Sequence, residues 1–138
     1  MPFKSSARKK MVRAELRDLE TRIEFMEGLV RRDPDYVDAL QLLGDHYTRR
    51  GRFADGLRVD EHLARLEPDN ALVFYNLACS YSLTDQFERA VLALEQALKL
   101  GYRDFAWLAK DPDLKKLRQQ PVYRDLQAKI RRLKVKIG

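Results

Sequence analysis

The 138-residue sequence predicts an all-α protein of repeated helix pairs, with a long helix before the repeats and a capping helix after them. Three observations lead to this prediction. Apolar residues recur at the three- and four-residue spacing of helices along most of the chain. The pattern returns after 34 residues, which indicates a repeat architecture. Only six glycines and five prolines are present, which leaves little room for long irregular stretches.

The first predicted element is one long helix over residues 7–32. It contains no proline, its single glycine (Gly28) lies near its end, and one apolar stripe runs along it: Val12, Leu16, Leu19, Ile23, Met26 and Val30. The simpler interpretation is that this stripe packs on the first repeat, as the second helix of a degenerate leading repeat would. The same spacing also fits a coiled-coil dimer through residues 12–30.

Two complete repeats follow, residues 37–70 and residues 71–104. Positions 34 residues apart match in size: Leu40 with Phe74, Leu43 with Leu77, Gly44 with Ala78, Tyr47 with Tyr81, Phe53 with Phe87, and Gly56 with Ala90. Each unit predicts a helix, a tight turn and a second helix. Gly44 lets a neighbouring helix approach closely, and Gly51 ends a helix because glycine tolerates positive φ.

A third unit begins at residue 105 and stops early. Asp111 is expected to cap a short helix with Pro112 at its first position, and Pro121 to start the last helix. Residues 105–138 are therefore predicted to be a degenerate repeat followed by a C-terminal cap. No linker-like stretch interrupts the chain, so residues 1–138 are expected to form one domain.

At these positions the sequence resembles the tetratricopeptide repeat (TPR). Both units show the family's order of a large residue, Leu, Gly or Ala, and Tyr, followed by Phe and a small residue. The run from Gly101 to Leu126 resembles an ending found after the last repeat in many bacterial TPR proteins, which implies a bacterial source. Gly56 and Asp60 stand where the family usually has alanine and an aromatic residue, so a looser, partly solvent-facing second helix is expected there.

The resemblance implies a non-catalytic adaptor or scaffold that binds a peptide or partner protein in a concave groove. The first helices of successive repeats line such a groove, and Tyr75 would offer it a flat apolar surface while Asn76 would bond a peptide backbone. The matching positions, whose side chains are expected to be exposed, are Asp38, Gln41, Leu42, Asp45 and Arg49 in the first unit, Leu72, Tyr75, Asn76, Cys79 and Ser82 in the second, and Ala106 and Lys110 in the third.

One class of partner is expected to be excluded. Chaperone-binding TPR proteins clamp the carboxylate of a tail ending in Glu-Glu-Val-Asp, and Asn76 and Lys110 match two of their clamp positions. Gln41 and Asp45, however, stand where that clamp has a lysine and an asparagine. Because Asp45 would repel a carboxylate, no binding of such tails is expected.

No catalytic, metal or cofactor site is expected. The two histidines, His46 and His62, lie 16 residues apart without clustered ligands and are expected at the surface or half-buried. Cys79 has no histidine partner suggested by position, and it fits a packing or groove-wall role better than a nucleophile. There is no glycine-rich phosphate loop.

Charge and targeting signals add two further expectations. Residues 1–13 hold five bases and no acid, and residues 115–138 hold nine bases and one acid, around an acidic body. The basic ends suggest binding of nucleic acid or an anionic surface as an alternative function. The opposite charges of the body and the ends also permit a self-associating structural subunit. A secretory signal and a membrane span both need longer apolar runs, so a cytoplasmic location is expected, and the single cysteine fits a reducing compartment.

Overall fold

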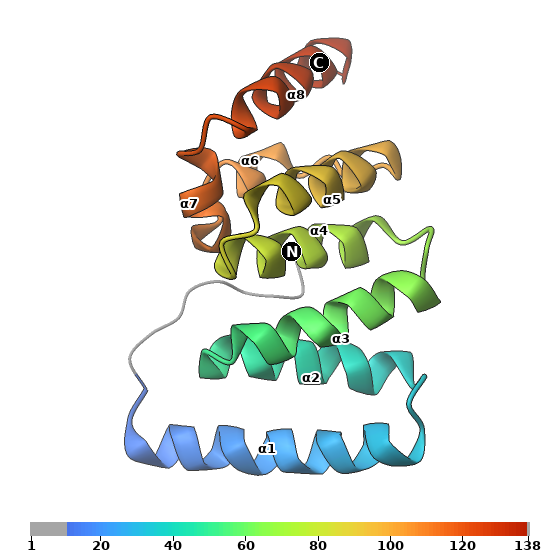
Figure 1. Ribbon diagram of the computed structural model, residues 1–138, viewed down its shortest axis with the longest axis vertical. Coiled ribbons are helices and arrows are strands. Elements are labelled where there is room, and N and C mark those ends of the chain that lie inside the picture. The colour runs from blue at the N-terminus through green and yellow to red at the C-terminus, as the bar shows by residue number, and fades with distance from the viewer. Residues whose placement is uncertain (1–10, 138) are drawn as a thin grey trace.

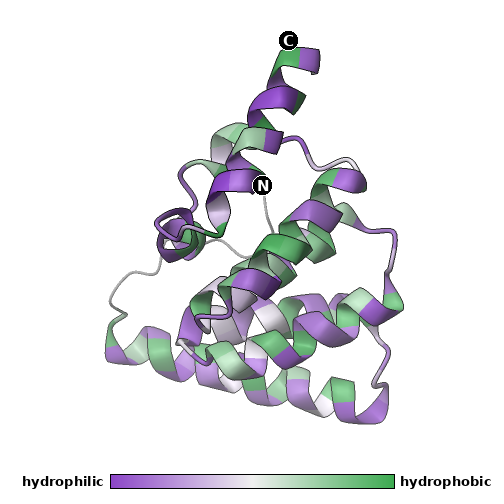
Figure 2. Ribbon diagram, turned by 45° about the horizontal axis from the view of Figure 1, so that its top comes forward, coloured by the Kyte–Doolittle hydropathy of each residue, from purple (hydrophilic) through white to green (hydrophobic). Residues whose placement is uncertain are grey.

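The computed structural model describes residues 11–137, in which helices joined by short turns stack one after another and no strand occurs (Figure 1). Around most helices apolar and polar residues alternate, as expected of helices buried on one side, whereas α4 (Ala71–Leu83) is apolar nearly all round (Figure 2). The predicted all-α solenoid is confirmed. The elements are α1 (Arg13–Arg32), α2 (Val37–Arg50), α3 (Phe53–Leu66), α4 (Ala71–Leu83), α5 (Phe87–Lys99), α6 (Phe105–Leu108), the 3₁₀ turn η1 (Pro112–Leu114), α7 (Lys115–Arg118) and α8 (Tyr123–Ile137).

Helix α1 packs on the first repeat through its apolar stripe. Leu19 and Ile23 are buried against Leu43 and Tyr47 of α2. The helix starts at Arg13, later than expected, and positions 7–10 of the predicted helix lie outside the described residues. The packing agrees with the simpler interpretation of the stripe.

Two equivalent hydrogen bonds show that α1 stands in the place of a repeat's second helix. The hydroxyl of Tyr47 donates to Glu27 on α1 at 2.5 Å, and the hydroxyl of Tyr81 donates to Glu61 on α3 at 3.0 Å. Donor and acceptor are both displaced by 34 residues between the two bonds. The α1–α2 contact therefore repeats the α3–α4 contact.

Two residues of α3, Gly56 and Asp60, are buried more deeply than expected. A Cβ atom on Gly44 of α2 would lie 3.2 Å from Asp60 Oδ1 and 3.4 Å from Val59 Cγ1, so the glycine does permit the close approach. Asp60 is only 2% exposed and accepts a 2.5 Å hydrogen bond from Ser80 Oγ on α4. The expectation of a partly solvent-facing helix at Gly56 and Asp60 is wrong, because both residues are buried between α2 and α4.

The two repeats form the equivalent turn with different residues. Gly51 has φ +86°, and a Cβ atom added there would meet nothing within 4 Å, whereas Asp85, 34 residues later, has φ +59°. Because the left-handed region costs an L-residue about 1 kcal/mol, Asp85→Gly is expected to raise the free energy of unfolding by about 0.5–1 kcal/mol in urea titration. The exposed ion pair of Asp85 with Lys116 adds little. Gly51→Ala is the reciprocal control and should destabilise; a loss of stability in the Asp85 variant would contradict this account.

The C-terminal segments fold back over the second repeat. Asp111 caps η1 by accepting from the backbone N–H of Asp113 at 3.0 Å, and Pro112 opens the turn as expected, although the turn is 3₁₀ rather than α-helical. η1 and α7 then pack on α4, and α8 starts at Tyr123, two residues after Pro121. This arrangement places one large core cluster across α4, α5, α7 and α8. Within residues 11–137, no helix combines the length and the apolar content that crossing a bilayer requires.

Candidate functional site

One face of α2 carries the first-unit residues that the sequence assigned to a groove. This α2 face (Asp38, Gln41, Leu42, Asp45 and Arg49) follows helical spacing, while the buried residues of the opposite side pack on α1 and α3. Asp38 and Arg49 are exposed, Leu42 is 39% exposed, and Gln41 and Asp45 are half-buried. The α2 face therefore presents an apolar group, an amide and charges of both signs to solvent.

The α2 face continues onto α1 at its C-terminal end. Arg49 lines a cavity of about 140 Å³ together with residues of α1, among them Glu15, Asp18 and Arg22. The cavity holds two acids and two bases, so it suits a polar group of either charge. It extends the accessible surface of α2 beyond the helix itself.

The equivalent face of α4 is covered by the chain's own C-terminal part. Tyr75 and Cys79 are 0% exposed, and Asn76 and Ser82 are also buried; only Leu72 is half-buried. The expectation that these second-unit side chains are exposed is wrong. The reason is that η1 and α7 pack against α4 on this side. The exposed residues Ala106 and Lys110 lie on α6 and just after it.

A buried hydrogen-bond network, here called the Asp111 cluster, joins α4 to the segment that covers it. The Tyr75 hydroxyl donates to Asp111 Oδ2 at 2.6 Å, and the Cys79 thiol donates to the same oxygen at 3.7 Å. The ring of Tyr75 stacks on that of Tyr102 with centroids 4.4 Å apart. Burial raises the pKa of both the Tyr75 and the Tyr102 phenols, so both stay protonated at neutral pH.

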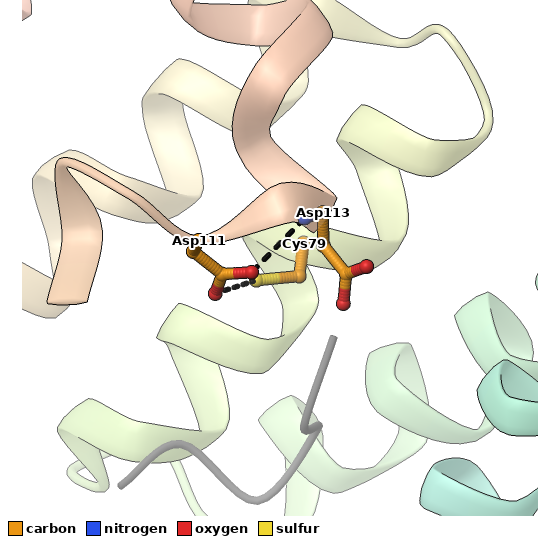
Figure 3. A group of neighbouring side chains, drawn as sticks. All are labelled: Cys79, Asp111 and Asp113. Atoms are coloured by element: carbon orange, nitrogen blue, oxygen red, sulfur yellow. Dashed lines mark hydrogen bonds between the residues drawn. The ribbon is translucent and has the colours of Figure 1, made fainter. Parts of the chain in front are cut away.

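The same cluster brings together residue types that can bind a metal. Cys79 Sγ and carboxylate oxygens of Asp111 and Asp113 lie within 4.8 Å of one another, and all three residues are buried (Figure 3). Both oxygens of Asp111 already accept hydrogen bonds, from Tyr75, Cys79 and the Asp113 backbone. We therefore assign the cluster to holding the C-terminal segment on α4. Sequence reasoning did not group these residues, since Cys79 and Asp111 are 32 positions apart.

His46 is another residue that the sequence placed wrongly. It is 6% exposed, not at the surface or half-buried, and lies on the side of α2 that packs against other helices. Burial, followed by the positive charges of Arg49 and Arg22, lowers its pKa from the usual 6.5. His62, by contrast, is half-buried and forms a hydrogen bond through Nε2, which lies 2.9 Å from Oδ1 of Asp35.

The lowered pKa of His46 predicts a loss of stability in mild acid. The unfolded chain takes up a proton at this histidine near pH 6.5, and the folded chain only at lower pH. The contribution of His46 to the free energy of unfolding is therefore complete above pH 6.5 and declines as the pH falls below it. Between pH 7 and pH 5 the Tm should fall further in the wild type than in His46→Gln. Arg49→Gln, which removes one of the charges, should shift the His46 titration in NMR upward. Equal pH profiles for wild type and His46→Gln would contradict the assignment.

Comparison with known proteins supports the repeat interpretation. The family profile described as "Tetratricopeptide repeat" matches residues 71–100, which include α4 and α5. A chloroplastic protein of Arabidopsis thaliana is 30% identical over 113 residues, which cover 78% of this chain and 32% of that protein. Peroxisomal targeting signal receptors from Komagataella phaffii and Komagataella pastoris are each 35% identical over 91 residues, 64% of this chain and 16% of the receptor.

The chain thus spans a third or less of the length of these relatives. They come from a plant and from yeasts, so the bacterial source stays a prediction. The family assignment itself rests on two findings that agree. The matched profile covers the second helix pair, and the bond from a tyrosine to a glutamate recurs 34 residues apart between α1–α2 and α3–α4. The chain is a tetratricopeptide-repeat protein.

Proposed function

We propose that the chain is a non-catalytic adaptor, and that it holds a peptide segment of a partner protein on the α2 face. A general role in protein–protein interaction follows from the repeats. The observation that supports this particular surface is the contrast between the two repeats: the α2 face has accessible side chains, whereas four of the five equivalent side chains of α4 are buried on the side where η1 and α7 pack. Of the groove positions expected from the sequence, those of the first unit can therefore contact a ligand directly.

The side chains of the α2 face suit an extended peptide. Leu42 offers an apolar contact, and the Gln41 amide can both donate to and accept from a peptide backbone. Asp38 and Asp45 outnumber Arg49, which favours a neutral or basic segment. We expect no binding of tails ending in Glu-Glu-Val-Asp, because Asp45 repels their carboxylates. The yeast relatives are named as receptors of a targeting signal, which supports a peptide as the kind of ligand.

Affinity capture tests the proposal with a matched pair of double variants. Leu42→Arg/Arg49→Glu changes the α2 face, and Phe25→Arg/Arg17→Glu makes the same exchanges at exposed positions of α1. Partner proteins retained by the wild type and by the α1 variant should be lost by the α2 variant. Retention by the α2 variant, with both variants folded by circular dichroism, would reject the α2 face as the binding surface. Cell fractionation of the same tagged chain tests the proposed cytoplasmic location.

A further inference from the structure

A second surface lies at the far end of the helix stack, between α5 and α8. The first half of α8 is anchored by the buried residues Tyr123, Leu126 and Ile130, and towards their C-terminal ends α5 and α8 separate (Figure 1). The space between them is a cavity of about 350 Å³, here called the α5–α8 cavity. It is lined by Glu95, Leu98, Lys99, Arg103, Lys129, Arg132, Leu133 and Lys136. This volume is within the roughly 300–1,000 Å³ of ligand-binding pockets.

The cavity combines an apolar floor with a basic rim. Among the described residues that line it, five are basic and one is acidic, and Leu98 and Leu133 supply the apolar part. The acid, Glu95, is already paired with Lys129. Four cationic side chains therefore surround the cavity without an acidic partner among its lining residues. An anionic group placed between them would relieve their mutual repulsion.

Arg103 shows that part of this rim is held in place. Its Nη1 donates to the backbone carbonyls of Leu98 and Tyr102, each at 2.8 Å, so the guanidinium is fixed beside the end of α5. Interactions with helix dipoles account for a base at the C-terminal end of α5 and of α8, such as Lys99 and Lys136. They do not account for Arg132, which lies inside α8 and is exposed. The charge of the cavity is thus more than helix capping requires.

We propose that the α5–α8 cavity binds an acidic, amphipathic segment of a second partner protein. Apolar side chains of that segment would lie on Leu98 and Leu133, and its carboxylates would meet Arg103, Arg132 and Lys136. A protein segment fits better than nucleic acid for two reasons. The described lining offers no aromatic side chain on which a base could stack, and Leu98 and Leu133 offer an apolar surface that suits aliphatic side chains. The inference goes beyond the proposed function, because α2 lies near one end of the stack, next to α1, and α8 lies at the other end (Figure 1).

Fluorescence polarisation with a labelled peptide of repeated Glu-Glu-Leu-Leu units tests this proposal on the full chain. Arg132→Glu/Lys136→Glu reverses two charges of the cavity, and Arg124→Glu/Arg131→Glu reverses two exposed charges of the same helix that do not line it. Both variants change the net charge equally. The cavity variant should weaken binding of the peptide about tenfold or more, and the control variant less than about threefold. Polyuridylate RNA at equal concentration should not displace the peptide from the protein.

Three results would overturn the proposal. Equal weakening by both double variants would reduce the effect to the net charge of the protein. Peptide-induced NMR shifts at residues 38–49 instead of residues 95–103 and 129–136 would place the acidic peptide on the α2 face. Efficient competition by RNA would make the basic side of α8 a nucleic-acid surface. None of these outcomes depends on the affinity capture with the α2 variants, so the two proposed surfaces are tested independently of each other.

Discussion

Replacing Asp111 with alanine is expected to lower the free energy of unfolding by about 3–5 kcal/mol, because it removes the acceptor of several buried donors at once. The Tyr75 hydroxyl, the Cys79 thiol and the backbone N–H of Asp113 all donate to this carboxylate. None of these donors would have water as a substitute, since Tyr75, Cys79 and Asp113 are at most 2% exposed. Urea unfolding followed by circular dichroism measures the change.

Asp104→Ala is the matched control for this prediction. Asp104 is also an aspartate that caps a short helix, accepting from the Trp107 N–H at 3.1 Å, but it is exposed. Its loss should cost only about 1 kcal/mol. Asp111→Asn keeps an acceptor oxygen and should fall between the two. If the Asp111 and Asp104 alanine variants were equally stable, the Asp111 cluster would not be what holds η1 on α4.

Replacing Ile23 with alanine is expected to cost about 3 kcal/mol of unfolding free energy. Ile23 is 1% exposed and packs with Leu43 and Tyr47 of α2, so its truncation leaves a cavity between the two helices. Phe25→Ala removes a larger side chain from the same helix, but Phe25 is 61% exposed, and the expected cost is below about 0.5 kcal/mol. Thermal unfolding of the two variants beside the wild type measures both effects.

The same pair of variants bears on the coiled-coil alternative for residues 12–30. Since the stripe of α1 is used against α2, light scattering should give the mass of one chain, and the stability of the wild type should not rise with protein concentration. If the wild type were a dimer and the Ile23 variant a monomer, the apolar stripe of α1 would instead form the contact between two chains. Self-association through other surfaces would leave the Ile23 variant dimeric.

Much of the fold could be predicted because repeat positions repeat their environment. Equivalent places are occupied by Leu43 and Leu77, and by Tyr47 and Tyr81. The breaks between helices contain Gly51 and Pro68. The departures were harder to interpret. Asp60 replaces an aromatic residue and was expected to face solvent, but Ser80, which is specific to the second unit, provides a buried donor for it. A polar residue at a core position is interpretable only together with its partner.

For the candidate site, too, a residue's exposure could be predicted where its own helix determines it, and not where a distant segment covers it. The exposure of Leu42 and Arg49 follows from the helical pattern of α2 alone. The burial of Tyr75 depends on Asp111, which lies 36 residues later on a turn that repeat positions do not describe. One signal was present: Leu114 and Leu117 are apolar in a segment too short to bury them by itself, so they had to pack on another element. The α5–α8 cavity depends on the angle of α8, which the sequence does not specify.

The Asp111 cluster also bears on the order in which the chain folds and unfolds. Contacts in the stack join mainly helices that are neighbours in the chain, so each pair can form quickly and locally. The contact of η1 with α4 bridges α5 and α6, and it ties residues 71–126 into one cooperative unit. Helix α1, at the other end, packs mainly on α2, through a smaller cluster with four buried residues. Partial unfolding is therefore expected to begin at α1, next to the face proposed to bind a partner, while the C-terminal half stays folded.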